Sequence, residues 1–321
     1  MSANDEYSSA TVLVLGASGF IGRRVSRRLC SRGADVHLAV RNKAKALDIF
    51  NSCSVDGTAH EVDLSDTTQV DGLYQRVRPD ITFNLAGYGI GPDERDGHAA
   101  RRINADLPAF ICRAASRFGT GNWAGQQIVH AGSAAEYGHN LDGFAESGST
   151  DPTSLYGVTK LEGTRALATV AEELGVAAVT ARIFNAYGPG ERAGRLLPSL
   201  IEAAKTGTEV RLTDGRQKRD FIYVDDIAEG LLRLGRVQDS QYPTFNLATG
   251  TFTTVKCFVD MAARVLGLGA RQLKFGSISM AEQERDWNMD TKAVPVRRLR
   301  QTLNWTPSTS VATGIAKTIK F

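Results

Sequence analysis

Short apolar runs alternate with longer amphipathic runs over the first 185 residues of the chain. The apolar runs predict strands over 11–16, 35–40, 80–87, 126–133 and 176–185, with a further strand in the segment 60–66, and the amphipathic runs predict helices over 20–33, 67–77, 106–119 and 154–175. Because the predicted strands are almost continuously apolar, we expect both faces of their sheet to be covered. Strands that alternate with helices in this way indicate an α/β fold with a doubly wound parallel sheet.

The pattern changes after about Asn185. Proline and glycine become frequent, a strand that runs into a helix is predicted over 219–234 with a cap near Asp225, and a further strand is predicted over 242–250. We therefore predict two domains: residues 1–185, to which parts of 209–250 return, and a smaller C-terminal lobe made mainly of residues 186–321 and interleaved with the first. A cleft between two such lobes is the usual place for a ligand.

Composition narrows the class of protein only slightly. The 321 residues carry 38 Lys and Arg against 35 Asp and Glu, and this net charge of +3 gives no reason to expect a nucleic-acid partner. The four cysteines are scattered without CxxC spacing, so neither a metal site nor a disulfide framework is expected. The first ten residues are polar, and no apolar run reaches the roughly 18 residues of a membrane span. We expect a cytoplasmic protein that binds neither nucleic acid nor membrane.

Three glycines connect the first predicted strand to the helix that follows it. In VLVLGASGFIG, Gly16, Gly19 and Gly22 form a GxxGxxG pattern. In such turns the first glycine allows the tight turn, the second lets the backbone approach a pyrophosphate, and the third lets helix and strand pack closely. The helix N-terminus then faces the negative charge. After an apolar strand and before an amphipathic helix, the pattern predicts a dinucleotide-binding turn of the Rossmann type.

A tyrosine and a lysine lie one helical turn apart in the segment SLYGVTKLEG, residues 154–163. Residues four apart on a helix share a face, so Tyr156 and Lys160 are expected side by side. A nearby ammonium group stabilises a tyrosinate, and a phenol whose pKa is lowered from about 10 can act as a general acid or base near neutrality. The alternative is a pair of side chains on the outside of a helix with no chemical role.

Together, the GxxGxxG turn and the Tyr-x-x-x-Lys pair resemble the short-chain dehydrogenase/reductase superfamily. The resemblance covers nearly the whole chain and is to the extended branch, the NAD-dependent epimerase/dehydratase family of nucleotide-sugar enzymes. The motifs that carry it follow in order: NLAG from Asn84, AGSAAEYG from Ala131, RIFNAYGPG, RDFIYVDDIA and LNWTPSTSVATGI. The resemblance implies a Rossmann fold with a smaller C-terminal substrate-binding lobe, and a nicotinamide cofactor.

The resemblance also implies roles for individual residues. Ser133 would hydrogen-bond the substrate oxygen, Tyr156 would transfer the proton, and Lys160 would hold the nicotinamide ribose. Asn104 corresponds to a helix asparagine that supports the site. The residues expected to contact the cofactor are Gly16, Ser18, Gly19, Phe20, Ile21, Gly22, Arg41, Asp63, Leu64, Leu85, Ala86, Gly87, Asn104, Tyr156 and Lys160.

The end of the second predicted strand bears on the kind of nicotinamide. An acid about 20 residues past the glycine turn binds the adenosine 2′-hydroxyl of NAD, but this position holds Val40 or Arg41. Arg41 can bind a 2′-phosphate, with Lys43 or Arg23 nearby. We therefore predict NADP(H); NAD(H) stays open, because Arg41 as an exposed loop charge would leave the preference undetermined.

The residues after Ser133 favour one reaction over others. In the family's 4,6-dehydratases an Asp-Glu pair follows the catalytic hydroxyl, and here Ala134 and Ala135 occupy those places. Glu136, one residue further on, is expected to be a structural or substrate-orienting carboxylate rather than a base. The stretch GSAAEYG resembles reductases of nucleotide-linked 4-keto-6-deoxyhexoses, which consume NADPH.

The resemblance also implies a substrate with a nucleotide diphosphate, which needs cations and backbone donors. The expected substrate-binding residues are Tyr88, Ser133, Ala134, Asn185, Arg192, Arg219 and Arg285, with Tyr187 and His139 as further candidates for the sugar pocket. For each arginine, a surface salt bridge is the alternative interpretation.

We predict from the sequence an NADPH-dependent 4-ketoreductase of a nucleoside-diphosphate 4-keto-6-deoxyhexose, with Tyr156 as the general acid. Three alternatives stay open: a nucleotide-sugar epimerase that retains NAD, a reductase of a non-nucleotide carbonyl compound, and a catalytically silent cofactor-binding regulator. By analogy with the family, we also expect a homodimer.

Overall fold

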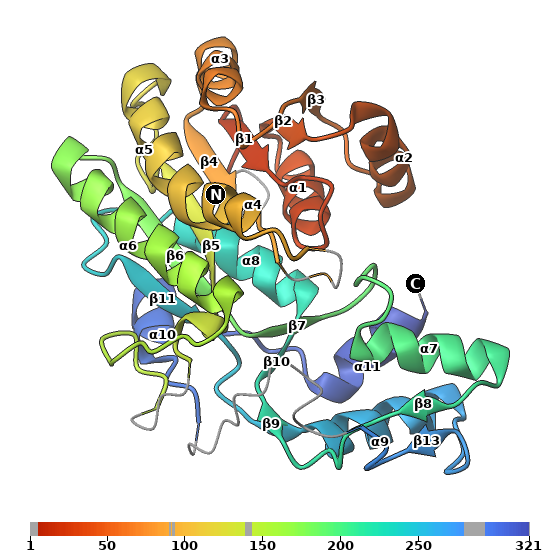
Figure 1. Cartoon of the computed structure of the whole chain (residues 1–321). Helices are drawn as coiled ribbons and strands as arrows, with labels where there is room; N and C mark the ends of the chain where they lie inside the picture. The colour runs from red at the N-terminus through yellow and green to blue at the C-terminus, as the bar shows by residue number, and fades with distance from the viewer. Residues whose placement is uncertain (1–5, 90, 92–93, 139–142, 279–292, 321) are drawn as a thin grey trace. The chain divides into compact units, whose positions relative to one another are not determined.

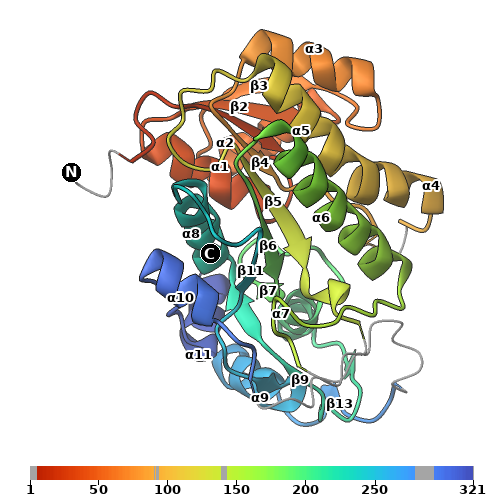
Figure 2. The same cartoon turned by 90° about the vertical axis from the view of Figure 1, so that its left-hand side faces the viewer.

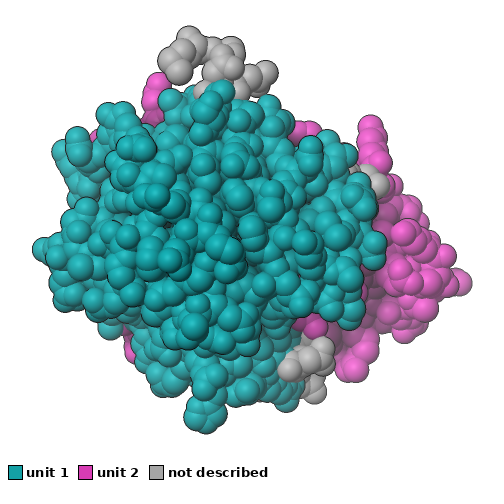
Figure 3. Space-filling model, turned by 90° about the horizontal axis from the view of Figure 1, so that it is seen from above, with its two compact units in different colours: residues 1–136, 155–182, 228–245 teal, residues 137–154, 183–227, 246–321 magenta. Residues whose placement is uncertain are grey.

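Three separate stretches of sequence build each of the two units into which the chain divides (Figure 3). The structure, a computed structural model, describes residues 6–89, 91, 94–138, 143–278 and 293–320. Unit 1 comprises residues 1–136, 155–182 and 228–245, and unit 2 comprises residues 137–154, 183–227 and 246–321.

A seven-stranded parallel sheet forms the centre of unit 1, with the strand order β11-β6-β5-β4-β1-β2-β3 (Figure 1). Within the sheet, β1 pairs with β2, where Val12 lies opposite Val36, and with β4, where Val12 lies opposite Ile81. The strands are β1 (Thr11–Leu15), β2 (Asp35–Val40), β3 (Thr58–Glu61), β4 (Ile81–Asn84), β5 (Ile128–Ser133), β6 (Ala178–Ile183) and β11 (Thr244–Leu247). The predicted doubly wound α/β fold is therefore confirmed.

Helices cover both faces of this sheet (Figures 1 and 2). One face carries α3 (Thr67–Val77), α5 (Leu107–Phe118) and α6 (Leu155–Leu174), and the other carries α1 (Gly22–Ser31), α2 (Lys43–Cys53) and the later part of α8 (Val224–Gly235). Short helix α4 (Gly97–Ala100) and the π-helix η1 (Arg101–Asp106) lead directly into α5, and the 3₁₀ turn η2 (Ala134–Glu136) follows β5. No helix among the described residues is both long and apolar enough to cross a membrane.

Helix α3 illustrates why the sequence folds as it does. The carboxylate of Asp66 accepts the backbone N–H groups of Thr68 and Gln69 and so caps the first turn. Apolar side chains then recur at helical spacing, with Val70, Leu73, Tyr74 and Val77 all buried. They join Leu13 and Leu15 of β1 and Ile111 and Leu167 of the neighbouring helices in one apolar core.

The strand order reverses beside β1. The chain proceeds from β1 to β2 and β3 on one side, and then returns to the other side of β1 with β4. In doubly wound sheets, ligands bind beyond the carboxyl ends of the strands at such a switch point. Gly16 follows β1 and Leu85 follows β4, so both residues lie at this edge.

Unit 2 packs its helices against short paired strands, β10 with β7, β12 with β9 and β13 with β8. An aromatic cluster lies in its core, where the rings of Phe221 and Phe258 stack at 4.2 Å between centroids. Asp220 accepts the backbone N–H groups of residues 249–251, and Asp226 those of residues 308 and 309. The elements are β7 (Asn185–Tyr187), α7 (Leu196–Thr206), β8 (Val210–Arg211), β9 (Lys218–Arg219), β10 (Phe221–Tyr223), β12 (Thr253–Thr254), α9 (Val255–Leu266), β13 (Leu273–Lys274), α10 (Arg297–Leu303) and α11 (Val311–Ile319).

The predicted elements of unit 1 are present, and two helical segments were missed. Helix α2 was not predicted, because it is weakly amphipathic and buries only Ala46 and Phe50. The run α4–η1 before α5 was also missed. Helix α8 begins at Val224, so Asp225 lies inside its first turn rather than at the predicted cap.

Candidate active site

The glycine turn packs tightly against the end of β4. Gly16 has φ +73°, and a Cβ built on it would lie 2.8 Å from the backbone nitrogen of Ala86 and 2.9 Å from the carbonyl oxygen of Leu85. A Cβ on Gly22, the first residue of α1, would collide with the carbonyl oxygen of Gly16. The structure therefore supports two of the predicted glycine roles, the tight turn and the close packing of helix on strand.

The same turn fits a dinucleotide. No side chain caps the N-terminus of α1, and its first turn holds no acidic residue, so the helix itself places no negative charge at its positive end. A Cβ on Gly19 would lie 3.1 Å from the carbonyl oxygen of Gly16, so a larger residue would crowd the turn. These features are what a pyrophosphate needs at a helix N-terminus. We propose that Gly16, Ser18, Gly19, Phe20, Ile21 and Gly22 hold the cofactor phosphates.

The end of β2 carries charges of both signs. Arg41 directly follows the strand and is exposed. On the neighbouring strand, Glu61 lies opposite Val40, and its carboxylate accepts the backbone N–H of Lys43 at 2.7 Å. Glu61 lies on β3, outside the strand from which NADP(H) was predicted, and a carboxylate at this position opposes binding of a 2′-phosphate.

Two further groups of predicted cofactor contacts lie at the same edge of the sheet. Asp63 and Leu64 follow β3, and the carboxylate of Asp63 is engaged in a local turn with Ser65, whose N–H it accepts at 2.9 Å. Leu85, Ala86 and Gly87 follow β4 beside the glycine turn. Their contact with a cofactor stays a prediction.

Tyr156 and Lys160 both lie near the chain segment that follows β4. A Cβ on Gly89 would lie 3.6 Å from Cδ2 of the Tyr156 ring, and a Cβ on Gly87 would lie 3.7 Å from Nζ of Lys160. The Lys160 side chain is only 2 % exposed, and its ammonium group donates to the carbonyl oxygens of Ala131 at 2.9 Å and Ala86 at 3.4 Å. Lys160 is therefore no surface residue, and it joins α6 to the ends of β4 and β5.

Burial makes the Lys160 ammonium group easy to deprotonate. Loss of solvent lowers the pKa of Lys160 to about 8, while the negative charge of Glu136 opposes this shift. His130 lies close by, and burial together with the Lys160 charge lowers the pKa of His130 well below its usual value. His130 is thus neutral, with its Nδ1 3.0 Å from Nδ2 of Asn84.

Asn104 organises the loop between β4 and α4. Its amide donates to the carbonyl oxygen of Tyr88 at 2.8 Å and accepts the Tyr88 N–H at 3.0 Å, and it also donates to Oγ1 of Thr159 at 3.0 Å. Asn104 lies in the π-helix, and such irregular turns often mark functional sites. The helix α6 approaches this turn closely at Gly163, where a Cβ would collide with the carbonyl oxygen of Asn104. The predicted supporting role of Asn104 thus has a geometric basis.

Ser133 ends β5, and the turn after it is closed by hydrogen bonds. Oγ of Ser133 accepts the N–H of Ala135 at 3.1 Å, and the N–H of Ser133 donates to Oε1 of Glu136 at 2.7 Å. The other carboxylate oxygen of Glu136 accepts Nε of Arg182 at 2.8 Å. Glu136 is fully buried and bound to these two partners, and its expected role as a structural carboxylate rather than a base stays a prediction.

The profile of the NAD dependent epimerase/dehydratase family matches residues 12–248. The chain belongs to this family. It is therefore an NAD(P)-dependent enzyme of the extended short-chain dehydrogenase/reductase type, as the motifs indicated.

Characterised relatives within the family catalyse different reactions. The chain is 27 % identical to a dTDP-6-deoxy-L-talose 4-dehydrogenase (NAD(P)+) of Kitasatospora kifunensis, over 93 % of this chain and 91 % of that protein. It is 26 % identical to a dTDP-4-dehydro-6-deoxy-D-allose reductase of Streptomyces bikiniensis, covering 82 % and 83 %. It is also 26 % identical to UDP-glucuronate 4-epimerase 1 of Arabidopsis thaliana, covering 97 % and 76 %.

Solved structures of the family share the fold. A UDP-glucose 4-epimerase of Thermotoga maritima, solved with UDP-glucose, matches with a TM-score of 0.83 over 96 % of this chain and 97 % of that one, at 22 % identity. MoeE5, solved with UDP-glucose and NAD, matches with a TM-score of 0.78 over 96 % and 97 %, at 26 % identity.

The remaining predicted substrate residues of this epimerase/dehydratase family member belong mostly to unit 2. Asn185 begins β7, Arg219 ends β9 with 7 % of its surface exposed, and Arg192 is exposed in the loop before α7. In that loop, Glu191 pairs with Arg195 at 3.3 Å, and burial raises the pKa of the Glu191 carboxyl to about 7. Tyr88 and Ala134 lie in unit 1, whereas Arg285 and His139 fall outside the described residues.

Tyr187 is a core residue rather than part of a sugar pocket. Only 2 % of it is exposed, and its ring packs edge-on against Phe258 at 5.3 Å between centroids. Its hydroxyl group lies against Gly314 of α11, where a Cβ would collide with it. The suggestion that Tyr187 lines the substrate site was therefore wrong, because a strand residue in an aromatic core resembles a pocket aromatic in sequence.

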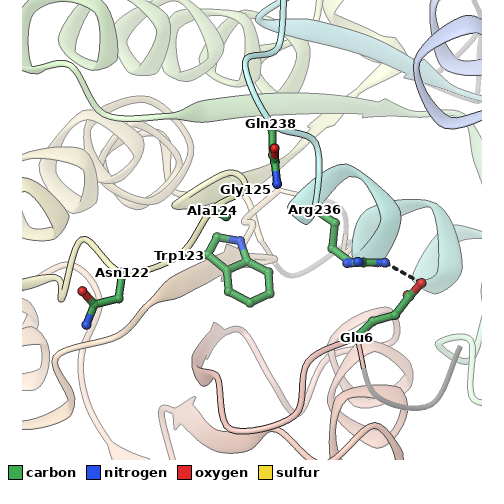
Figure 4. Close-up of a pocket in the computed structure, with 7 residues that line it drawn as sticks. All are labelled: Glu6, Asn122, Trp123, Ala124, Gly125, Arg236 and Gln238. Atoms are coloured by element: carbon green, nitrogen blue, oxygen red, sulfur yellow. Dashed lines mark ion pairs between the residues drawn. The ribbon is translucent and has the colours of Figure 1, made fainter. Parts of the chain in front are cut away.

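A separate cavity of about 290 Å³ lies at the opposite edge of the unit 1 sheet, near the amino ends of β1 and β5 (Figure 4). Figure 4 shows the Trp123 ring beside it, and Arg236 pointing toward Glu6, with which it forms an ion pair. The indole of Trp123 stacks on Tyr7 and donates to the carbonyl oxygen of Gly235 at 2.8 Å. This cavity contains none of the predicted site residues of the family member.

Sequence reasoning missed two buried polar pairs near the family's catalytic residues, Glu136 with Arg182 and Asn84 with His130. A signal was present in each case. Arg182 and His130 interrupt nearly continuous apolar strands, and a charged or polar residue in such a strand usually has a buried partner.

Proposed function

We propose that this protein is an NADPH-dependent 4-ketoreductase that acts on a nucleoside-diphosphate 4-keto-6-deoxyhexose. The observation that carries the proposal is the turn after Ser133. Ala134 and Ala135 stand where a dehydratase needs its acid and base, and Glu136 is engaged by Ser133 and Arg182. A site that lacks an elimination base but keeps Ser133, Tyr156 and Lys160 is suited to carbonyl reduction.

In this proposal each residue has a defined task. When bound, the reduced nicotinamide supplies a hydride to the carbonyl carbon. The Ser133 hydroxyl donates a hydrogen bond to the carbonyl oxygen, and Tyr156 gives that oxygen its proton, so the product is an alcohol. Lys160 stabilises the tyrosinate that remains, and Asn104 keeps the Tyr88 segment in place beside them.

Turnover tests the proposal directly. Purified protein is mixed with NADPH and a dTDP-linked 4-keto-6-deoxyhexose. The absorbance of NADPH at 340 nm is expected to fall in proportion to the amount of sugar that is reduced. The relatives that reduce or oxidise position 4 of dTDP-deoxysugars make this substrate class the first choice. Absence of turnover with any nucleotide-linked 4-keto sugar, in a protein that still binds cofactor, would refute it.

The second candidate is a nucleotide-sugar epimerase that retains NAD. Glu61 favours the epimerase. It ends β3, its carboxylate reaches the residues that follow β2, and a carboxylate at this place suits an unphosphorylated adenosine ribose. An epimerase predicts a purified protein that carries tightly bound NAD and interconverts two sugars with no net change in absorbance. A reductase predicts a cofactor that exchanges freely.

Arg41 is proposed to select NADP(H). Arg41→Ala is expected to weaken NADPH binding about 10- to 100-fold, because a charge-assisted hydrogen bond contributes about 1.5–3 kcal/mol, while NADH binding stays unchanged. Fluorescence titration of reduced cofactor measures both affinities. Glu61→Gln should have the opposite effect on NADPH, and Lys45→Ala, an exposed lysine on α2, is the matched control. Tighter binding of NADH than NADPH by the wild type would contradict the assignment.

Arg219 distinguishes a nucleotide diphosphate from a simpler carbonyl substrate. If it binds the diphosphate, Arg219→Ala should raise KM for the sugar nucleotide about 10- to 100-fold and change kcat little, since it removes a charged hydrogen bond far from the reacting carbon. Arg211→Ala, an exposed arginine in the same unit, is the control. An unchanged KM at unchanged melting temperature favours the reductase of a non-nucleotide compound.

We also propose a homodimer and soluble expression in the cytoplasm, both by analogy with the family. The exposed positions of α5 and α6 are mostly charged, including Arg113, Arg117, Arg165, Glu172 and Glu173. Light scattering of the purified protein measures the assembly state, and a monomeric mass would rule the dimer out.

A further inference from the structure

Glu136 is fully buried, and it meets the same stretch of β5 as Lys160: Oε1 of Glu136 lies 2.6 Å from a Cβ built on Gly132, and Nζ of Lys160 donates to the carbonyl oxygen of the preceding residue, Ala131, at 2.9 Å. Glu136 lies in the 3₁₀ turn that follows Ser133. One of its oxygens accepts the Ser133 N–H at 2.7 Å and the other accepts Nε of Arg182 at 2.8 Å. Burial raises the pKa of the Glu136 carboxyl, while Arg182, the Ser133 N–H and the Lys160 charge act in the opposite direction and favour its charged form.

The surrounding strands are shaped for this pair. A Cβ on Gly132 would lie 2.6 Å from Oε1 of Glu136, so a glycine before Ser133 leaves room for the carboxylate. Arg182 reaches it from β6, the strand beside β5, and its side chain is 6 % exposed. Gly132 on β5 thus leaves the space in which Glu136 of the turn η2 and Arg182 of β6 form a buried ion pair.

Among the residues that the structure describes, few polar groups face Lys160. From the turn η2 it senses the charge of Glu136, and from β5 it faces His130, which is neutral. The π-helix presents the uncharged amide of Asn104, and Tyr156 lies one turn away on the same helix. Of these, Glu136 alone carries a negative charge that favours the ammonium form over the neutral amine.

We propose that Glu136, held by Arg182, is a positioning residue of the active site: it fixes the backbone of Ser133 and keeps Lys160 protonated. It touches neither substrate nor cofactor in this role. The expected effect of Glu136 on turnover rests on the proposed function. Its expected effect on cofactor binding rests only on membership of the family.

Two variants separate the two effects. The double variant Glu136→Gln/Arg182→Gln removes both buried charges, while its amides can still bond to each other and to the Ser133 N–H. Glu136→Asp keeps the charge but is one methylene too short to hold the Ser133 N–H and Arg182 together. Glu162→Gln removes a carboxylate from the exposed face of α6, where it pairs with Arg101, and is the matched control.

The pH profile is the decisive measurement. With Lys160 near pKa 8, activity and cofactor affinity should fall on the alkaline side as the ammonium group is lost. The double variant should move this alkaline limb to lower pH by roughly half a unit or more, because the pKa of Lys160 falls further without Glu136. Glu136→Asp should leave the limb in place and lower kcat about tenfold at every pH, because the hydrogen bond to Ser133 is lost.

Each readout has an outcome that overturns the inference. If the double variant folds, and its alkaline limb and its kcat both match those of the control Glu162→Gln, the Glu136–Arg182 pair is only structural. If the double variant does not fold, Glu136→Asp decides alone, and an unchanged kcat would refute the positioning role. NADPH binding across pH needs no sugar substrate, so a failure of the proposed reaction stays distinguishable from a failure of this inference.

Discussion

Replacing Tyr156 with phenylalanine is expected to lower kcat by roughly 10²- to 10⁴-fold while cofactor binding and folding persist. The ring keeps its place beside Gly89, since the substitution removes only the hydroxyl group. Without it, no group at that position can give the substrate oxygen its proton. The measurement is the single-turnover rate at saturating NADPH and sugar nucleotide, compared with NADPH affinity from fluorescence titration.

Tyr74→Phe is the matched control for this prediction. Tyr74 is a fully buried tyrosine of the same unit, whose hydroxyl donates to Oγ1 of Thr82 at 2.9 Å. Its loss should cost about 1 kcal/mol of stability and leave kcat nearly unchanged. If Tyr156→Phe retains more than about a tenth of the wild-type rate, Tyr156 is not the general acid.

Replacing Gly163 with alanine is expected to disable the enzyme as severely, from a position that need touch no ligand. The new Cβ would overlap the carbonyl oxygen of Asn104, a backbone atom of the π-helix that has little freedom to yield. Relief requires α6 to move away from η1, and α6 carries both Tyr156 and Lys160. We expect a loss of about 1–3 kcal/mol or more in unfolding free energy and about a hundredfold loss of kcat.

Gly72→Ala provides the comparison, because Gly72 also lies within a helix of unit 1. A Cβ there would meet only the mobile end of Arg76, at 3.3 Å. Alanine is the better helix former by about 1 kcal/mol, so this variant should be slightly stabilised and fully active. Chemical denaturation and turnover of the two variants side by side measure the contrast. Equal behaviour of both would show that α6 and η1 adjust freely to one another.

The sequence predicted those features that depend on local pattern. Helix 67–77 was predicted with the bounds that the structure gives, because a cap at Asp66 and apolar residues at helical spacing act together. The glycine turn was predicted from three residues whose spacing admits few backbone paths. Lys160 was placed in the site from its spacing to Tyr156 and from the family resemblance.

Features that depend on distant partners were not predicted in this way. Glu136 was recognised as a carboxylate unlike a dehydratase base, but its partner Arg182 is 46 positions away and only the strand order brings them together. Glu61 and Val40 meet through strand register, which sequence pattern leaves undefined. Tyr187 was misjudged because burial by α11 depends on Gly314, 127 residues later.

The divided path of the chain through unit 1 has a consequence for synthesis and for engineering. The strand order sets β6 beside β11, and residues 183–227 of unit 2 come between them along the chain. A nascent polypeptide stopped near residue 185 would leave the β6 edge bare, and bare edges recruit other chains. A cofactor-binding fragment that ends at that point should therefore aggregate when it is expressed. A fragment in which residues 228–247 are joined back by a short connector has the last strand of the sheet and should stay soluble.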